Sequence, residues 1–317
     1  MITSSGAGYS TCSGVAVTRW REDTTRDPWG SFIYLRDVGS GKVWSSGYQP
    51  LGEEPEFYQV IFSEDKAVTK RRDGNISTQT EIIVSPEDDA EIRRISITNN
   101  SSTAKEIEAT SYAEIVLVSP KADDAHPAFS NLSIETDFNS SENSLIAKRR
   151  PRAEKDEPIW AIHTIATDGE TTGALQYETD RARFLGRGHD ARQPSAILED
   201  RPLSNTVGAV LDPIFSLRCC VRIQPLETVH ISFSTAVAHS SEEAIRLADK
   251  YHDISIFERE AALAWTRSQV EMRHLNIDPE SAYLFQRLAA RVLYSDLSLR
   301  ARQRVLALNT KAQSDLW

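Results

Sequence analysis

The chain has 317 residues, of which 26% are charged and 40% hydrophobic, and its formal net charge is −10. This is a soluble composition, and the length suffices for one large domain or two ordinary ones without disulfides. A phosphate-binding surface needs clustered Lys and Arg. The densest basic runs, Lys70-Arg71-Arg72 and Lys148-Arg149-Arg150, are short and surrounded by acid. The sequence therefore predicts no nucleic-acid partner.

The three cysteines, Cys12 and the adjacent pair Cys219-Cys220, fit neither a disulfide framework nor a zinc site. We expect free thiols, with the adjacent pair on opposite faces of a strand. The seven histidines are scattered, so the sequence predicts neither a metal site nor a cofactor. No segment approaches the ~20 apolar residues of a membrane span, and the N-terminus lacks the features of a signal peptide. We expect a cytoplasmic protein.

Residues 1–238 are predicted to form short β-strands. Runs rich in Val, Ile, Thr and aromatic residues are separated by turn signals such as Asp73-Gly74. Apolar and polar residues alternate most clearly over residues 92–98. We expect strands at residues 15–20, 32–37, 57–62, 67–72, 76–84, 92–98, 107–118, 129–138, 160–166, 215–223 and 229–236. About fifteen strands without an intervening helical period predict a large two-sheet β-sandwich.

Residues 180–203 interrupt this pattern, because they are rich in Arg and Gly and contain Pro194 and Pro202. A loop of this length inside a compact domain is uncommon and usually functional. A solvated insertion is the alternative interpretation.

The period of the pattern changes to helical at Ser240. Ser240 and Glu243 form a capping-box signature, and a later apolar stripe includes Phe257 and Trp265. Asp278 followed by a proline predicts the start of a third helix, which we expect to continue toward residue 304. These apolar stripes need a packing partner. Because the chain stops on an aromatic residue directly after a polar turn, we expect a further domain to follow.

Several segments, taken in order, resemble one known family. They are Ile2-Thr3-Ser4-Ser5-Gly6-Ala7-Gly8-Tyr9-Ser10, Thr18-Arg19-Trp20-Arg21-Glu22-Asp23, Asp27-Pro28-Trp29-Gly30, Tyr34-Leu35-Arg36-Asp37, Val84-Ser85-Pro86-Glu87-Asp88-Asp89, Thr110-Ser111-Tyr112-Ala113-Glu114, His126-Pro127-Ala128-Phe129-Ser130, Phe184-Leu185-Gly186-Arg187-Gly188 and Leu211-Asp212-Pro213-Ile214-Phe215. The chain resembles, over essentially its whole length, the glycoside phosphorylase family that includes cellobiose phosphorylase. It is most similar to the phosphorylase-like region of cyclic β-1,2-glucan synthases.

The resemblance implies a mainly β fold of galactose mutarotase-like type. It implies a β-supersandwich, often called a carbohydrate-binding domain, at residues 1–238 and a helical linker at residues 239–310. Residues 311–317 would begin an (α/α)6 barrel, before which the chain is truncated.

In that family the general acid, an Asp, and the phosphate-binding residues lie in the barrel. We therefore expect no catalytic residue in this chain and no phosphorolysis by the chain alone. The resemblance also implies a parent glycosyltransferase or glycoside phosphorylase that acts on a β-linked glucan or oligosaccharide. The barrel and a second copy in a homodimer are the expected protein partners. The parent is expected to be associated with the inner membrane.

Sugar rings stack on aromatic planes, while charged and amide groups bond their hydroxyls. Residues 9–37 hold the densest set of aromatic residues beside charges. Candidate carbohydrate contacts are Tyr9, Trp20, Arg21, Asp27, Trp29, Tyr34, Arg36 and, in the segment at 180–203, Arg187. Core packing is the alternative role for the aromatic residues. Because Asp27-Pro28 should interrupt a strand, we expect Trp20 on a strand and Trp29, more exposed, on the segment after it.

Three functions are consistent with these patterns. The first, which we predict, is a carbohydrate-binding or scaffolding portion of a β-glucan-active protein. The second is a purely structural module that packs against the barrel and mediates dimerisation without touching sugar. The third is a mutarotase-type sugar epimerase, which needs a histidine acid and a carboxylate base. His126, His163 and His230 would be the candidate acids for that reaction.

Overall fold

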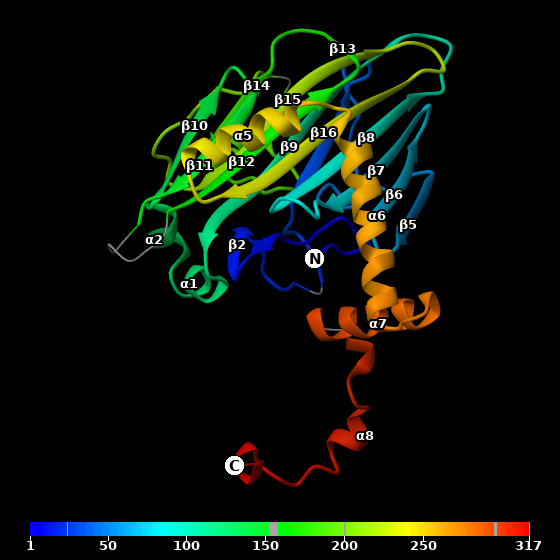
Figure 1. Ribbon diagram of the computed structural model, residues 1–317, viewed down its shortest axis with the longest axis vertical. Coiled ribbons are helices and arrows are strands. Elements are labelled where there is room, and N and C mark those ends of the chain that lie inside the picture. The colour runs from blue at the N-terminus through cyan, green and yellow to red at the C-terminus, as the bar shows by residue number, and fades with distance from the viewer. Residues whose placement is uncertain (24, 152–157, 200, 295–296, 317) are drawn as a thin grey trace.

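The computed structural model describes residues 1–23, 25–151, 158–199, 201–294 and 297–316. Within these ranges the strands form two eight-stranded antiparallel sheets, which pack face to face (Figure 1). The first sheet contains β1 (Thr11–Cys12), β2 (Val15–Thr18), β3 (Phe32–Asp37), β4 (Val43–Ser45), β9 (Lys105–Val118), β13 (Glu170–Thr171), β14 (Gln176–Asp180) and β15 (Pro213–Ile223). The second runs in the order β10 (Ile134–Asn139), β11 (Ser144–Arg149), β12 (Ile159–Thr167), β16 (Thr228–Ala238), β8 (Ala90–Asn99), β7 (Ile76–Val84), β6 (Lys66–Asp73) and β5 (Phe57–Phe62). The predicted two-sheet supersandwich is confirmed.

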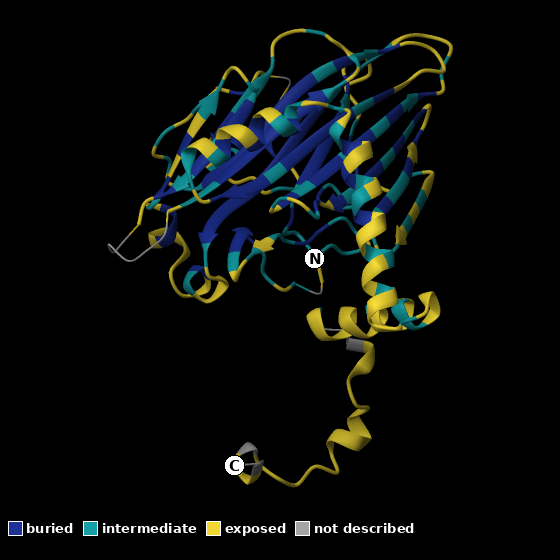
Figure 2. Cartoon of the chain, in the orientation of Figure 1, coloured by how far each residue is buried: buried dark blue, intermediate teal, exposed yellow. Residues whose placement is uncertain are grey.

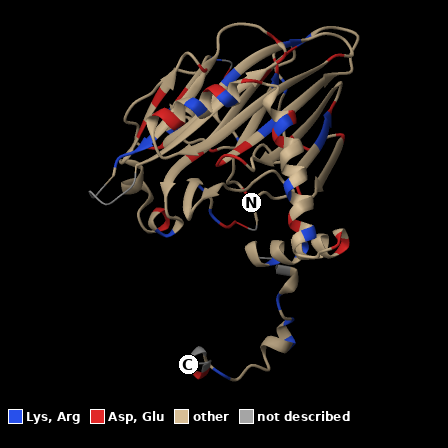
Figure 3. Ribbon diagram, viewed as in Figure 1, with Lys and Arg blue, Asp and Glu red and all other residues tan. Residues whose placement is uncertain are grey.

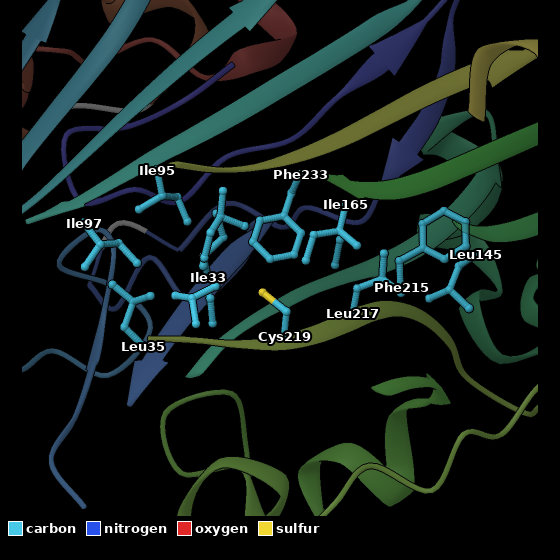
Figure 4. Close-up of a cluster of buried hydrophobic side chains, with 14 of the residues drawn as sticks. Ile33, Leu35, Ile95, Ile97, Leu145, Ile165, Phe215, Leu217, Cys219 and Phe233 are labelled. Carbon is cyan, nitrogen blue, oxygen red and sulfur yellow. The ribbon is translucent and has the colours of Figure 1, made fainter. Parts of the chain in front are cut away.

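The main hydrophobic core lies between the two sheets. Figure 4 shows Phe233 and Ile165 of the second sheet facing Leu217 and Cys219 of the first. Each large apolar side chain buried in this way contributes ~1.5–3 kcal/mol to folding. The alternation predicted over residues 92–98 is confirmed, because Ile95 on β8 is fully buried in this core. The polar side chains between such positions face the outer surface of the second sheet.

The expected strand at residues 129–138 is wrong in its first half. Two short helices, α1 (Pro120–Ala125) and α2 (Pro127–Asn131), precede β10. Each begins with a proline, which fits the first turn of a helix because its missing N–H would be unpaired there. His126 lies between the two helices and forms the end of one and the start of the other. The apolar residues around Phe129 therefore belong to a helix that packs beside β9.

Residues 180–203 form a packed cover rather than a solvated insertion. The segment contains α3 (Arg181–Leu185) and α4 (Ser195–Leu198). Phe184 and Ile197 are buried on the outer face of the first sheet against side chains such as Tyr34 and Tyr112. Residues 187–193, between the two helices, form a mostly exposed loop.

Three longer helices follow the sandwich: α5 (Ser241–His252), α6 (Ile256–His274) and α7 (Pro279–Leu293). Ser240 accepts a bond from the N–H of Glu243, and the Glu243 carboxylate accepts one from the N–H of His239, which confirms the predicted cap. Asp278 likewise caps α7 by accepting from the N–H of Ser281. None of the described helices has the length and apolar character needed to cross a membrane.

The third helix is shorter than predicted, because α7 ends at Leu293 instead of continuing toward residue 304. Tyr294 turns back, and its hydroxyl donates to the backbone carbonyl of Asp23 over 3.0 Å. Beyond it lie a 3₁₀ helix at Leu297–Leu299, the short α8 (Gln303–Leu306) and a second 3₁₀ helix at Gln313–Leu316. Trp317, the last residue of the expected barrel start, lies outside the described residues.

The helices pack on the outer face of the second sheet only as far as the first half of α6. Tyr251 of α5 and Phe257 of α6 are buried against Ile92 and its neighbours on that face. Glu260 is fully buried, pairs with Lys250 at 2.9 Å and accepts from Ser85. Beyond this point α6 leaves the sheet, so the predicted stripe is split between a buried Phe257 and an exposed Trp265.

His163 lies in the core between the rings of Phe215 and Phe233, at centroid distances of 5.6 and 5.9 Å. Its two ring nitrogens are bonded to the hydroxyls of Ser111 and Thr235. Burial in this apolar site lowers the pKa of His163 to about 3, so the ring stays neutral. A neutral, enclosed imidazole cannot serve as the acid of a mutarotase-type epimerase.

We predict that His163 makes the protein less stable in acid. An unfolded chain binds a proton at this histidine below pH ~6.5, whereas the folded chain does not until about pH 3. The free energy of unfolding therefore keeps its full value above pH ~6.5 and decreases as the pH falls below that value. We expect a loss of about 2 kcal/mol between pH 7 and pH 5 from this residue. Urea unfolding of the wild type and His163→Gln at both pH values measures it.

In the His163→Gln variant the free energy of unfolding should fall by about 2 kcal/mol less between pH 7 and pH 5 than in the wild type. This difference does not depend on how stable the variant is at pH 7. The matched control is His274→Gln, at an exposed histidine in the last turn of α6, which should keep the wild-type dependence. An unchanged pH dependence in His163→Gln would contradict the assignment.

Candidate carbohydrate-facing site

A small pocket lies beside β9 of the first sheet, between the segment before β3 and the cover at residues 180–203. Its volume is about 180 Å³. Trp29, Asp23 and Arg26 line it from the segment before β3, and it reaches Glu114 of β9 and Arg181 of α3. We call it the Trp29 pocket. It combines an aromatic ring with charged groups, which is the chemistry that the sequence predicted for residues 9–37.

The segment that carries Trp29 is fixed by contacts to the N-terminal residues. The Asp27 carboxylate accepts from the hydroxyls of Thr3 and Ser5 at 2.7 and 2.6 Å. The carbonyl of Trp29 accepts from the N–H of Gly8 at 2.9 Å. At Gly30 a Cβ atom would lie 3.0 Å from the ring of Phe32 and 3.1 Å from the backbone of Ala7, so a larger residue would require these neighbours to shift. The indole is thus held at the pocket without belonging to the core.

A buried ionic network supports one side of the pocket. Arg19, which is 8% exposed, donates to Glu114 at 2.7 Å and to both carboxylate oxygens of Asp123. Arg181 donates to the other oxygen of Glu114 at 2.6 Å. Arg21 pairs with Asp123 at 2.6 Å. These pairs join the residues after β2 to β9, α1 and α3, so one set of charges fixes several segments that are distant in sequence.

The electrostatics of this network favour permanent charges. Burial alone would raise the pKa of Asp123, but Arg19 and Arg21 outweigh it and hold that pKa below its usual value. Burial alone would lower the pKa of Arg19, but Asp123 and Glu114 raise it instead. Among the described residues, every carboxyl group with a displaced pKa is displaced downward. A general acid for glycosidic bonds needs the opposite displacement.

Trp20 lies beside the pocket but not on a strand, because β2 ends at Thr18. The expectation of a strand position is therefore wrong. Its half-buried ring packs against Tyr9 at a centroid distance of 5.2 Å and against Tyr294 at 6.1 Å. Trp29 follows the expectation of a loop before β3 and is half-buried. Tyr9 and Trp20 thus form an aromatic cluster with Tyr294, which follows α7, while Trp29 lines the pocket.

Three other candidates have structural partners. Arg21 is paired with Asp123 and Asp124, and Asp27 holds the N-terminal segment as described above. Tyr34 is 1% exposed, and its hydroxyl donates to the carbonyl of Ala191 at 2.7 Å. A fully buried ring cannot stack on a sugar, so Tyr34 is no longer a candidate carbohydrate contact. It fixes the loop at residues 187–193 instead.

Arg36 and Arg187 do not line the Trp29 pocket. Arg36 lies on β3, half-buried, with Glu108 of β9 as its cross-strand neighbour. Arg187 is exposed in the loop between α3 and α4. Its neighbours His189 and Asp190 line a second pocket of about 660 Å³ on the same side of the molecule.

Glu114, Arg181 and Arg192 line the pocket but are not among the residues predicted from the sequence. A signal for Glu114 was present, because it is a carboxylate within the apolar strand at 107–118, and a buried charge requires a partner. For Arg181 and Arg192 the sequence carried no such signal. Their place at the pocket depends on how the cover at residues 180–203 folds over the first sheet. Among the described residues no group of three His, Cys, Asp or Glu side chains could hold a metal ion.

Comparisons with known proteins place these observations in context. Residues 1–254 match the family described as glycosyl hydrolase 94, supersandwich domain. The whole chain is 37% identical to cyclic β-(1,2)-glucan synthase NdvB of Rhizobium meliloti (strain 1021), of which it spans 11%. Over 75% of its length it is 26% identical to N,N'-diacetylchitobiose phosphorylase of Vibrio furnissii, of which it spans 29%. Over 69% it is 24% identical to solabiose phosphorylase of Paenibacillus borealis, of which it spans 27%.

We predict that the fold depends on the buried network. Replacing Arg19 with Met leaves Glu114 and Asp123 buried with one cation fewer. Breaking a buried pair in this way typically costs ~3–5 kcal/mol of unfolding free energy. Urea unfolding of Arg19→Met at neutral pH measures this cost.

The control is Arg72→Met, which removes an ion pair to Glu56 in which both side chains are 54% exposed. Such pairs contribute ~0–1 kcal/mol. If both variants lose the same stability, the network does not have the role assigned to it.

Proposed function

Because the chain belongs to the glycosyl hydrolase 94 family through its supersandwich domain, we propose that it is the non-catalytic, sugar-contacting portion of an enzyme that acts on β-linked glucan. The family membership confirms the resemblance found in the sequence. The chain spans 11% of its glucan synthase relative and 29% of a phosphorylase relative. The observation that carries the proposal is the Trp29 indole at a preformed pocket with charged side chains beside it.

The pocket has the chemistry that a sugar ring requires. The indole face offers an apolar surface for the C–H groups of a pyranose, and Asp23 and Arg26 supply an acceptor and donors for its hydroxyls. Binding sites commonly combine an apolar wall with a few well-placed polar groups. The contacts of Asp27 and Gly8 hold the segment in place before a ligand arrives, which lowers the entropic cost of binding.

The relatives support the class of ligand. The 37% identical relative is by name a cyclic β-(1,2)-glucan synthase, and the phosphorylase relatives are named for disaccharides. A β-1,2-linked glucan is therefore the ligand that we propose for this chain.

We predict that Trp29→Ala weakens the binding of a β-1,2-linked glucooligosaccharide. One aromatic contact contributes on the order of 1 kcal/mol, so affinity should fall about fivefold. Wild-type affinity should itself be weak, near the millimolar range. NMR shift titration of the full chain gives both values.

Trp265→Ala is the matched control, because this indole is 54% exposed on α6 and lines none of the pocket. It should bind as the wild type does. An unchanged affinity in Trp29→Ala would refute the proposed contact.

A second function, that of a scaffold, is favoured by the surface of α7. None of its side chains is buried, and Phe285, Leu288 and Val292 are 51%, 54% and 86% exposed. Figure 2 shows α7 and the chain beyond it as almost wholly exposed, in contrast to the strands. Figure 3 shows charges of both signs along α5 but few on α7. We propose that α7 packs against the barrel of the parent protein or against a second copy.

This proposal predicts different protection of the two helices from hydrogen exchange. Amides of α5 should exchange slowly, because α5 is packed on β12 and β16. Amides of α7 should exchange rapidly in a monomer, because local stability follows buried contacts. Mass spectrometry of the exchanged chain at low protein concentration measures both.

At high concentration the exposed face should drive association, which sedimentation would detect. The double variant Leu288→Glu and Val292→Glu should stay monomeric and keep the sandwich stability. Equal protection of α5 and α7 in a monomer would contradict the scaffold proposal.

A further inference from the structure

The Trp29 pocket has a larger neighbouring pocket with which it shares two lining residues. Asp190 and Arg192 line both. The larger pocket, which we call the His189 pocket, has a volume of about 660 Å³, against about 180 Å³ for the smaller one. The shared residues place the two pockets next to each other on the surface.

The His189 pocket has two walls of different origin. One is the loop between α3 and α4, with His189 and Gln193. The other is the segment after β4, with Leu51 and Glu53. Apolar surface is added by Leu198, which is 48% exposed. The lining thus offers carboxylate, imidazole and amide groups around a small apolar area.

The loop wall is fixed from within. The buried hydroxyl of Tyr34 donates to the carbonyl of Ala191 at 2.7 Å. The side chain of His189 bonds the carbonyl of Gln193 at 2.6 Å, and the N–H of Arg192 donates to the Asp190 carboxylate at 2.9 Å. These bonds hold the loop in one conformation.

The opposite wall is held by another buried group. Arg71 is 1% exposed, and its guanidinium donates to the carbonyls of Gly47 and Glu53 at 2.7 and 3.0 Å. The two walls approach each other at Gly52, where a Cβ atom would lie 3.5 Å from the Arg192 guanidinium. Both walls are therefore preformed, which reduces the cost of ordering them around a ligand.

We infer that the two pockets form one groove that binds consecutive residues of a linear β-glucan, with one end at Trp29 and the chain extending past Arg192 to His189. The inference rests on the proposed sugar-binding function and adds the length and path of the ligand. A short oligosaccharide fills only part of the groove, whereas a longer one also contacts the larger pocket. Affinity must then rise with ligand length.

The experiment compares a β-1,2-linked glucose disaccharide and pentasaccharide by NMR titration of the full chain. We expect the pentasaccharide to bind about tenfold more tightly, which corresponds to ~1.4 kcal/mol. The variants His189→Ala and Glu53→Ala come from opposite walls, so a disturbed loop cannot account for both. Each should bring the ratio of the two affinities close to one.

Gln79→Ala, on the outer face of the second sheet and in neither pocket, is the control that should keep the wild-type ratio. Equal affinity of the wild type for both ligands would overturn the groove and leave the proposed function standing. A wild type that binds neither ligand would overturn the proposed function together with the groove. Retention of the wild-type ratio by both wall variants would place the longer ligand elsewhere and refute the path.

Discussion

Burial of the Arg19 guanidinium is the constraint on which one end of this molecule depends. A cation removed from water must have anionic partners, and here they come from β9 as Glu114 and from α1 as Asp123. Because Arg181 of α3 also bonds Glu114, the cover of the first sheet is tied to the same point. The segment with Trp29 follows Arg19 directly in the chain. The ion pairs that compensate these buried charges therefore also fix the segments that line the pocket.

Much of the fold could be read from the sequence, because alternation and helix caps are local signals. The strand at residues 92–98 is specified by side chains that point alternately to the core and outward, and Ser240 and Asp278 mark helix starts through bonds to residues three positions later. Very short strands such as Thr11–Cys12 and Val43–Ser45 were not predicted, because too few residues carry the alternating pattern. The end of α7 escaped it because a contact with Asp23, distant in sequence, turns Tyr294 back.

The site was harder to predict, because its residues meet only through tertiary packing. The composition indicates residues 9–37 as a candidate site. It does not indicate that Trp29 lines the pocket whereas Tyr34 is buried. That difference arises from residues 180–203, whose Phe184 packs at 6.0 Å from the Tyr34 ring. The same segment supplies Arg192, which has no distinguishing sequence context. One part of this site therefore comes from the segment before β3, which the sequence indicated. The other part comes from residues 180–203, whose position over the first sheet could not be predicted from sequence patterns.

The bond from the Tyr294 hydroxyl to the Asp23 carbonyl has a mechanical consequence. Asp23 lines the Trp29 pocket, and Tyr294 follows the last residue of α7, whose apolar side chains are exposed. A force that draws α7 away from the sandwich acts on a wall of the pocket through this bond. Thermodynamic coupling between two sites is reciprocal. A ligand in the pocket that favours one position of α7 is therefore favoured by that position to the same extent, so the pocket and the helix are coupled through this one bond.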